Sequence, residues 1–496
     1  MKKSVLKMKR HIRYIKIKKV MACASAAMLI SGLCACGVQS ADSAASAEYL
    51  TKDDITVNET YSNDADGEHV LEVSGEEATY SNAGVTKTGD ADGDEADFYG
   101  ENSAVFATEK GTLTIKDSLI ETNGRHANAV FSYGEGTTVI IANTVIETQG
   151  DCSGGIMTTG GGTMNAENLS ISTSGRSSAA IRSDRGGGTV NVTKGYYKTT
   201  GTGSPVVYST ADITVSDAYM ESTASQGIVV EGKNSVTLNN DTLVADNNTK
   251  NSDKSEYYQA VMIYQSMSGD AAEGTSSFTA NGGSITNKNG DIFFVNNTAT
   301  EISLSGTEIT NEDAEGVFLR AEAAGWGNEG SNGGKVNMTA SGQVINGDML
   351  VDDVSTLNLY LKEKSAFTGS VNSSGQSGDV YVEIEDGSTW TLTSDSYISG
   401  LTVSEGSAIE LNGHKLYVDG KEYAAGSAST GEAFDISTGS GSDSGGPGGN
   451  PPEGEPPEKP DGNGGPGGNP PGGEPPEKPD GNGGPGGNPP GSESQD

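Results

Sequence analysis

The chain has 496 residues, of which 33% are hydrophobic, 6% are aromatic and 71 are glycine. This composition excludes a conventional thick core of large side chains and favours a thin, repetitive one. The formal net charge is −37, which argues against nucleic acid as a partner, because an acidic surface repels phosphates.

The N-terminus resembles a lipoprotein signal peptide. The first 35 residues hold nine Lys and Arg and no acid, and they include a short apolar segment from Val20 to Leu33. That segment is too short to span a membrane comfortably. Leu33 and Ala35, at positions −3 and −1 relative to Cys36, are similar to the lipobox cut by lipoprotein signal peptidase. The resemblance implies removal of residues 1–35, lipidation of Cys36 and display on the extracellular face of the cell membrane; ordinary secretion is the alternative.

Two segments of biased composition flank the body of the chain. Residues 36–65 are expected to be a lipidated tether, and the Ser/Ala-rich stretch Val38–Ala47 indicates flexibility. Residues 437–496 consist mainly of Gly, Pro, Asn and acidic residues, and GGPGGNPPEGEPPEKPDGN from Gly445 recurs as GGPGGNPPGGEPPEKPDGN from Gly464. Such a segment lacks apolar periodicity, so we expect a disordered tail.

Between these ends the chain repeats itself about every 25 residues, which is a solenoid period. The repeat is clearest in NSAVFATEKGTLTIKDSLIETNGR, ANAVFSYGEGTTVIIANTVIETQGD, SGGIMTTGGGTMNAENLSISTSGR and SAAIRSDRGGGTVNVTKGYYKTTGT. Apolar residues alternate at i and i+2 within each unit, which is typical of strands. Each unit is therefore a coil of about three short strands that buries its inner face only by stacking on its neighbours.

Two apolar columns follow from aligning the repeats. The first is predicted to pass through Val105, Val130, Ile156, Ile181, Val206, Ile228, Val261, Ile292, Val317 and Met349. The second is predicted to pass through Leu113/Ile115, Val139/Ile141, Met164/Ala166, Val190/Val192, Ile213/Val215, Val236/Leu238, Phe278/Ala280, Ile302/Leu304, Val336/Met338 and Leu357/Leu359.

This pattern resembles the right-handed parallel β-helix proteins. The stretch GSTWTLTSDSYISGLTVSEGSAIEL from Gly387 is similar to the strand repeats that close pertactin-type autotransporter passenger domains. The resemblance implies an all-β fold, with a parallel β-helix body over residues 66–436, about 10–13 coils and a C-terminal cap from about residue 380. It is evidence for the fold and carries little information about activity.

An outward stripe is the main candidate ligand-binding surface. If the first column points inward, alternation places its successors outward. These are Phe106, Phe131, Met157, Arg182 and Val207, with Tyr133 and Asp184 two residues after Phe131 and Arg182. Exposed rings beside a guanidinium and a carboxylate suit sugars, whose C–H faces pack on aromatics. The alternative is a facing that is off by one residue, which would make the stripe core.

Further candidates lie in the turns. Arg125, Asp151 and Arg176 follow the glycine that ends successive units and are predicted to form an alternating-charge ladder. The ladder is either solvated or a strip that binds the carboxylates of uronic or sialic acids. Arg185 adds to the same basic group, and Trp326, between glycines in a long loop, is either an exposed anchor or packs on its own coil.

Metal binding has only a weak candidate. The acidic run containing Asp90, Asp92, Asp94 and Asp97 offers hard oxygen ligands, so Ca²⁺ is conceivable, but the run lacks the pattern of an EF-hand loop. A solvated acidic loop is the alternative, and no other cofactor is expected. After processing at Cys36, Cys152 is the only other thiol, so we expect no disulfide within the body.

These observations favour a non-catalytic, adhesin-like or carbohydrate-binding surface lipoprotein that acts as a monomer. Its expected partners are polysaccharide, glycoprotein or a neighbouring cell surface, and it contacts the membrane only through its lipid. The first alternative is a lyase or hydrolase of acidic polysaccharide, for which Arg182, Asp184 and Arg185 are the one cluster that fits. The second alternative is a passive surface spacer.

Overall fold

A computed structural model describes residues 49–266, 268–375, 378–427 and 431–437. The predicted signal peptide, the lipidation site Cys36, the start of the tether and the tail beyond residue 437 lie outside the described residues. None of the helices within those ranges is long and apolar enough to cross a membrane.

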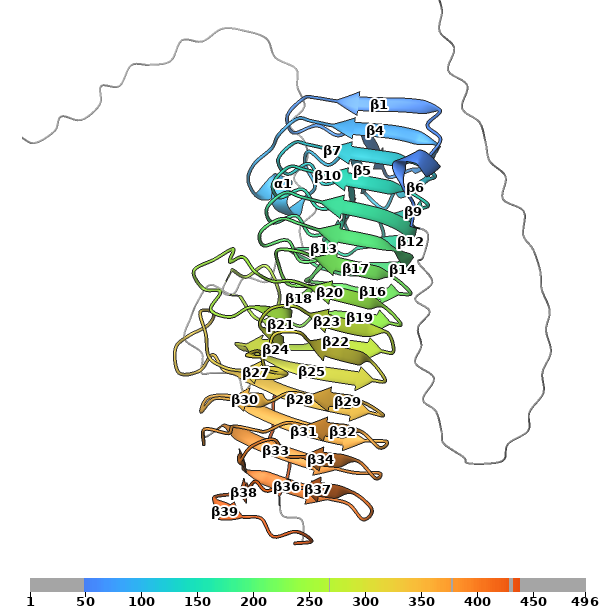
Figure 1. Ribbon diagram of the computed structural model, residues 1–496. Helices are drawn as coiled ribbons and strands as arrows, with labels where there is room; N and C mark the ends of the chain where they lie inside the picture. The colour runs from blue at the N-terminus through green and yellow to red at the C-terminus, as the bar shows by residue number, and fades with distance from the viewer. Residues whose placement is uncertain (1–48, 267, 376–377, 428–430, 438–496) are drawn as a thin grey trace, which may run out of the picture. The chain divides into compact units, whose positions relative to one another are not determined.

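The described chain is a stack of parallel strands, which confirms the predicted β-helix (Figure 1). Each coil gives one strand to an 11-stranded sheet, here called the first face, so at least eleven coils are present. Its strands are β2 (Leu71–Ser74), β5 (Val105–Thr108), β8 (Val130–Tyr133), β11 (Ile156–Thr159), β13 (Ile181–Ser183), β15 (Val207–Ser209), β18 (Ile228–Glu231), β21 (Gln259–Tyr264), β24 (Asp291–Asn296), β27 (Leu319–Ala321) and β30 (Met349–Val351).

A 21-stranded sheet bends around a corner and forms the second and third faces. The second face holds β3 (Glu77–Ser81), β6 (Thr112–Lys116), β9 (Thr138–Ala142), β12 (Gly162–Thr173), β14 (Gly188–Thr199), β16 (Asp212–Ser216), β19 (Ser235–Asn239), β22 (Thr275–Asn281), β25 (Thr298–Ser305), β28 (Gly334–Ser341), β31 (Thr356–Lys362), β33 (Asp379–Ile384) and β36 (Gly400–Val403).

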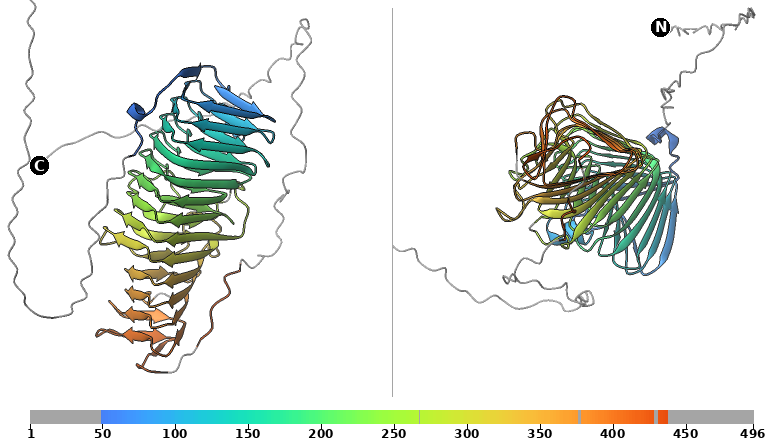
Figure 2. Two further views of the ribbon diagram at one scale, coloured as in Figure 1. Left: turned by 90° about the vertical axis from the view of Figure 1, so that its right-hand side faces the viewer. Right: turned by 90° about the horizontal axis from the view of Figure 1, so that it is seen from below.

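The third face holds β1 (Glu59–Asn63), β4 (Ala83–Lys87), β7 (Leu119–Thr122), β10 (Val145–Thr148), the second halves of β12 and β14, β17 (Tyr219–Ser222), β20 (Thr242–Ala245), β23 (Ser284–Asn287) and β26 (Glu308–Asn311). A four-stranded sheet continues it with β29 (Val344–Asn346), β32 (Ala366–Thr368), β34 (Thr389–Thr391) and β37 (Ala408–Glu410). Seen from below, the coils superpose around one axis (Figure 2).

The two ends of the stack differ from its middle. Strand pairing begins at β1, before the expected boundary at residue 66, and is preceded by η1 (Lys52–Asp54). Parallel stacking continues well past residue 380, and Trp390 is fully buried in the last coils. A final three-stranded sheet of β35 (Ser396–Ile398), β38 (Leu416–Val418) and β39 (Lys421–Glu422) includes the one antiparallel pair in the described ranges.

The predicted second column is confirmed from Leu113 to Ile302 in the strand register of the second face. It then slips by two residues, because Ile302 pairs with Met338 rather than with Val336, and Met338 pairs in turn with Leu359. A slip of two residues keeps the same side chains pointing inward. The first column is correct from Val105 to Ile181 but then passes through Val207, Phe293 and Leu319 in place of Val206, Ile292 and Val317. The number of residues between paired positions varies from coil to coil, so a fixed count misses the column by one or two positions.

Two corner columns explain the Gly and Asn content of the repeat. At the corner before the first face, a Cβ atom on Gly150 or Gly175 would lie 1.9 or 1.8 Å from the carbonyl oxygen of the glycine one coil earlier. No side chain fits there.

At the corner between the second and third faces, each coil turns on a left-handed residue such as Asn143 (φ 47°) or Asn168 (φ 52°), a conformation that Asn tolerates. Asn168 Nδ2 donates to Asn143 Oδ1 at 2.9 Å, so the turns also form a ladder.

Candidate functional site

The predicted stripe lies on the outer side of the first face, as the alternation required. Phe106 stacks on Phe131, Phe131 on Met157 and Met157 on Arg182. Their neighbours Val105, Val130, Ile156 and Ile181 belong to the main core, whereas Phe106, Phe131 and Met157 form a separate cluster against partly buried Tyr133. After Arg182 the stripe continues with Tyr208 rather than with the predicted Val207, which pairs with Ile181 and belongs to the main core.

The expected exposure of this stripe is wrong. Phe131 and Met157 are completely buried, and Phe106 is 7% exposed. They are outside the coil yet out of water, because a segment of chain folds back over them. The sequence allowed two interpretations, an exposed outward stripe or a column inside the core, and the structure shows neither of them.

The covering segment is residues 89–104, which contain α1 (Asp94–Phe98). A Cβ atom on Gly100 would lie 2.5 Å from the Phe106 ring and 3.0 Å from the Phe131 ring, so the segment presses on both. Thr159 Oγ1 donates to the carbonyl of Phe98 at 2.6 Å, and the Tyr99 ring meets Tyr133 edge-on at 5.6 Å. The acidic side chains of this segment are mostly exposed, as expected for a solvated loop. The segment is not only a solvated loop, however, because it also covers the apolar stripe.

Arg185 joins two segments that lie far apart in sequence. Its guanidinium sits 3.7 Å above the centre of the Phe98 ring. It also forms ion pairs with Asp270 at 2.7 Å and with Asp94 at 3.4 Å. Arg185 thus fastens the 89–104 segment and the loop containing Asp270 to the coil that carries Arg182.

Arg182 and Asp184 form a buried ion pair on the same strand edge. The distance from Arg182 Nη2 to Asp184 Oδ2 is 2.9 Å, and the side chains are 12% and 9% exposed. Burial raises the pKa of the Asp184 carboxyl, and the Arg182 guanidinium opposes this rise. The pair leaves the site with little net charge.

A pocket of about 230 Å³ opens beside this pair. It lies over the first face and is partly roofed by the insert 247–258, which contributes Asn251. The lining residues are Ser177, Ala179, Arg182, Asp184, Gly203, Pro205, Tyr208, Asn251 and Tyr264. Sequence reasoning found Arg182 and Asp184 and missed Tyr208, Tyr264 and Asn251, which later coils and an insert supply.

The two tyrosines of the pocket share a buried carboxylate. Tyr208 and Tyr264 both donate to Glu231 Oε2, the second at 3.0 Å. Glu231 is 1% exposed and its Oε1 has no hydrogen-bond partner. Burial raises the pKa of both phenols well above the usual range, and the nearby carboxylate acts in the same direction. Both hydroxyls therefore stay protonated.

The predicted Arg ladder is not found. Arg125 pairs with Asp92, and Arg176 Nε donates to Asn251 Oδ1 at 2.9 Å. Asp151 accepts the backbone N–H of Arg176 at 2.8 Å, and among the described residues it makes no ion pair with either guanidinium. At this corner of the coil the Arg125 and Arg176 side chains reach residues of the segments 89–104 and 247–258. The spacing of the residues along the chain does not indicate these contacts.

Trp326 is partly buried and packs on Tyr264, a residue of another coil, with ring centroids 5.1 Å apart. Both alternatives expected for Trp326, an exposed anchor and packing on its own coil, are therefore wrong. Nearby, Arg320 pairs with Asp291 at 2.6 Å and with Glu322 at 3.0 Å, and lies 4.2 Å above the Tyr257 ring. The sequence signal for this second group is an Arg followed two residues later by an acid. Arg320-Ala321-Glu322 has this pattern, as does Arg182-Ser183-Asp184.

The acidic residues of the Ca²⁺ hypothesis have separate partners. Asp90 accepts the backbone N–H of Arg125 at 2.7 Å, Asp92 pairs with the Arg125 guanidinium, and Asp94 pairs with Arg185. Asp97 faces His126. Within the described ranges the four carboxylates therefore form no common oxygen cage, and calcium binding stays a prediction.

Asp97, His126 and Cys152 instead form the one compact group of metal-type ligands in the described ranges. The Asp97 carboxylate, and after it the Cys152 sulfur, raises the pKa of His126 to about 9. Sequence reasoning had named Asp97 alone, because the three residues are far apart along the chain.

No protein-family description, curated protein or solved structure matches this chain.

Proposed function

We propose that the protein is a non-catalytic, glycan-binding lipoprotein of the cell surface, anchored by a lipid on Cys36 and acting as a monomer. The observation that carries the proposal is the pocket between Arg182, Asp184, Tyr208 and Tyr264. Its lining offers an ion pair and phenols above a buried carboxylate, which suits the hydroxyl groups of a sugar ring.

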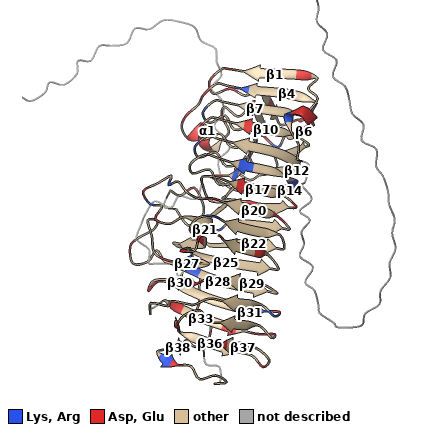
Figure 3. Ribbon diagram, in the orientation of Figure 1, with Lys and Arg blue, Asp and Glu red and all other residues tan. Residues whose placement is uncertain are grey.

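The size and charge of the pocket narrow the ligand class. A volume of about 230 Å³ lies below the roughly 300–1,000 Å³ of pockets for drug-sized ligands, so the pocket suits one sugar unit of a longer chain. Because Arg182 and Asp184 neutralise each other, a neutral sugar of a polysaccharide or glycoprotein fits better than a uronic or sialic acid. The strands carry few charges of either sign (Figure 3), so charge along the coils adds little.

The test is retention of the full chain on neutral, uronic and sialylated glycans, with release of products recorded in parallel. Tyr208→Phe removes one of the two tyrosine hydroxyls of the pocket and should weaken retention about tenfold, whereas Tyr196→Phe should leave retention unchanged. Tyr196 is the matched control because its hydroxyl also donates to a glutamate, Glu221, at 3.2 Å on another face.

Each alternative function has its own outcome. Released reducing or unsaturated ends would replace the proposal with a lyase or hydrolase. Neither retention nor products would favour a passive spacer. Retention that both tyrosine variants keep would place the ligand elsewhere on the surface and overturn the assignment of this pocket.

A further inference from the structure

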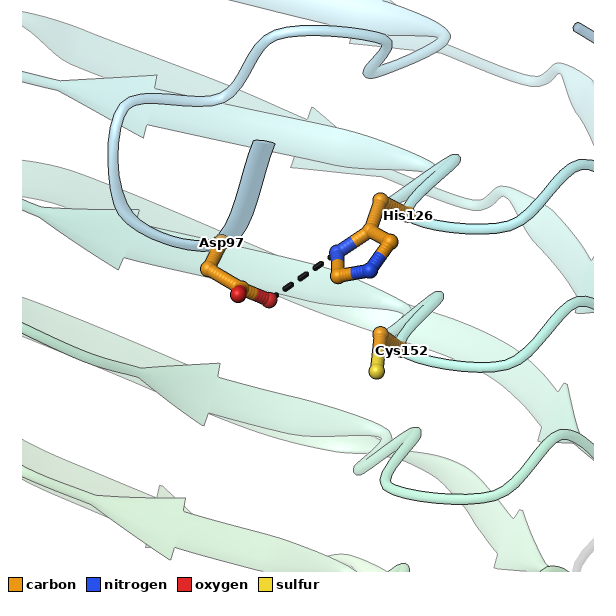
Figure 4. A group of neighbouring side chains, drawn as sticks. All are labelled: Asp97, His126 and Cys152. Carbon is orange, nitrogen blue, oxygen red and sulfur yellow. Dashed lines mark ion pairs between the residues drawn. The ribbon is translucent and has the colours of Figure 1, made fainter. Parts of the chain in front are cut away.

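Asp97, His126 and Cys152 converge beneath α1, at the edge of the covering segment (Figure 4). Asp97 belongs to α1, while His126 and Cys152 occupy the same corner position in consecutive coils. Both have left-handed backbone conformations, with φ of 54° and 55°, and Ser177 continues the series at 53°. His126 N donates to the carbonyl of Asp151 at 2.9 Å, and Cys152 N to that of Arg176 at 2.8 Å. The repeat therefore aims an imidazole and a thiol in one direction, one coil apart.

The three ligand atoms are close enough to share one ion. One donor atom from each residue lies within 4.8 Å of the other two, and Asp97 Oδ1 is 2.9 Å from His126 Nδ1. His126 is 7% exposed, yet its Nδ1 lacks a hydrogen bond of regular geometry. The buried ring nitrogen therefore faces a carboxylate and a thiol at short range, which is the arrangement of a mixed nitrogen, oxygen and sulfur ligand set.

The donor set selects the metal. One sulfur, one nitrogen and one carboxylate oxygen suit Zn²⁺, which binds Cys, His and Asp in tetrahedral sites, whereas Ca²⁺ and Mg²⁺ prefer oxygen alone. Three protein ligands leave the fourth position for water. When the ion binds, the thiol releases its proton to solvent, and an imidazolium releases one of its two and keeps the N–H on the nitrogen that does not bind the ion.

We propose that Asp97, His126 and Cys152 bind Zn²⁺ and that the ion clips the 89–104 segment onto the first face. The segment covers Phe106, Phe131 and Met157, so the ion would bridge two coils and the cover of this apolar cluster. Thiolate ligation would also protect Cys152, the one free cysteine among the described residues, from oxidation. This site is separate from the sugar pocket, and neither proposal depends on the other.

The experiment uses the full chain with Cys23, Cys34 and Cys36 replaced by Ser, so that Cys152 is the only thiol. Titration with Zn²⁺ should show one tight site, and Co²⁺ should give an intense near-ultraviolet band from thiolate-to-metal charge transfer. Cys152→Ser should abolish the band, and His126→Gln and Asp97→Asn should each weaken Zn²⁺ binding by at least about tenfold.

Asp94→Asn is the matched control, because Asp94 lies on the same helix but its side chain is 73% exposed and pairs with Arg185. This variant should bind Zn²⁺ as the parent does. Zn²⁺ should also slow amide hydrogen exchange in residues 94–104 of the parent chain and leave it unchanged in Cys152→Ser. Equal Zn²⁺ affinity in the parent and in Cys152→Ser, with both folded by circular dichroism, would overturn the proposal, as would the absence of the Co²⁺ band.

Discussion

The outer sides of the first and second faces are built from the same kind of repeat but meet different surroundings. On the second face, the outward column runs through Thr114, Ile140, Asn165 and Asn191; Ile140 is 37% exposed, and no covering segment buries it. On the first face, the corresponding column runs through Phe131 and Met157, which are fully buried. In Figure 1, α1 and the long loops lie along one edge of the stack.

The difference shows where pockets and clusters of reactive side chains form in a solenoid of this kind. Stacked strands present the same shallow row of side chains at every coil, so a bare face offers ladders such as Asn165–Asn191. Inserts that fold back over a face bring in side chains from distant coils. Both the pocket beside Arg182 and the Asp97–His126–Cys152 group are completed by such inserts, namely 247–258 and 89–104.

The largest expected effect is the loss of coil stacking, on which both faces depend. Gly175→Ala would place a Cβ atom 1.8 Å from the Gly150 carbonyl oxygen, which coils cannot relieve without unstacking. We expect a loss of roughly 4 kcal/mol or more in the free energy of unfolding, measured by urea denaturation. Gly306→Asn is the control, because nothing lies within 4 Å and φ is 58° there, and it should change stability by less than about 1 kcal/mol.

The second prediction contrasts the two outward columns directly. Phe131→Ala should cost about 3–5 kcal/mol because it opens a cavity under the covering segment. Ile140→Ala on the bare face should cost less than about 1 kcal/mol. Thermal melts of the two variants check this difference, and equal costs would mean that the cover over Phe131 does not form in solution.

A third prediction compares ion pairs on the two sheets. Asp184→Asn leaves the Arg182 guanidinium buried without its partner and should cost roughly 3 kcal/mol. Glu221→Gln removes the 3.1 Å pair with Lys198, whose side chain is 33% exposed, and should cost at most about 1 kcal/mol. Chemical denaturation at low and high salt gives both values, and only the second should shrink in salt.

The fourth prediction is a pH dependence and concerns Asp241, a buried acid at the corner between β19 and β20. Burial raises its pKa from 3.8 to about 7, although it accepts the backbone N–H groups of Ala218 and Asn239. A raised folded-state pKa means that the unfolded chain loses its proton first as the pH rises. Stability should therefore fall between about pH 4 and pH 7, by up to about 4 kcal/mol, and then level off.

The measurement is the stability of the parent chain minus that of Asp241→Asn across this pH range. The Asn variant carries an offset of its own, because an amide accepts only one of the two N–H groups, but that offset does not titrate. A difference that stays flat from pH 4 to pH 7 would show that Asp241 ionises as it does in the unfolded chain.

The repeat predicted the strands and the inner column of the second face because a buried position recurs unchanged in every coil. The series from Leu113 to Ile302 was aligned correctly for that reason. The first-face column slipped after Ile181, because the number of residues between paired positions varies from coil to coil. The candidate site was found in part: Arg182 and Asp184 carry a visible local pattern, whereas Tyr208, Glu231 and Tyr264 join them only through stacking.

The sequence by itself predicted the parallel β-helix, since alternating apolar residues at a 25-residue period are buried when coils stack, and it favoured an outward Arg182 while leaving the facing of the stripe open. The tertiary structure alone decided that the outward stripe is covered and that Asp97, His126 and Cys152 meet. The physical reason is that an insert carries no periodic signal, and the place where it folds back depends on packing against side chains that are distant along the chain.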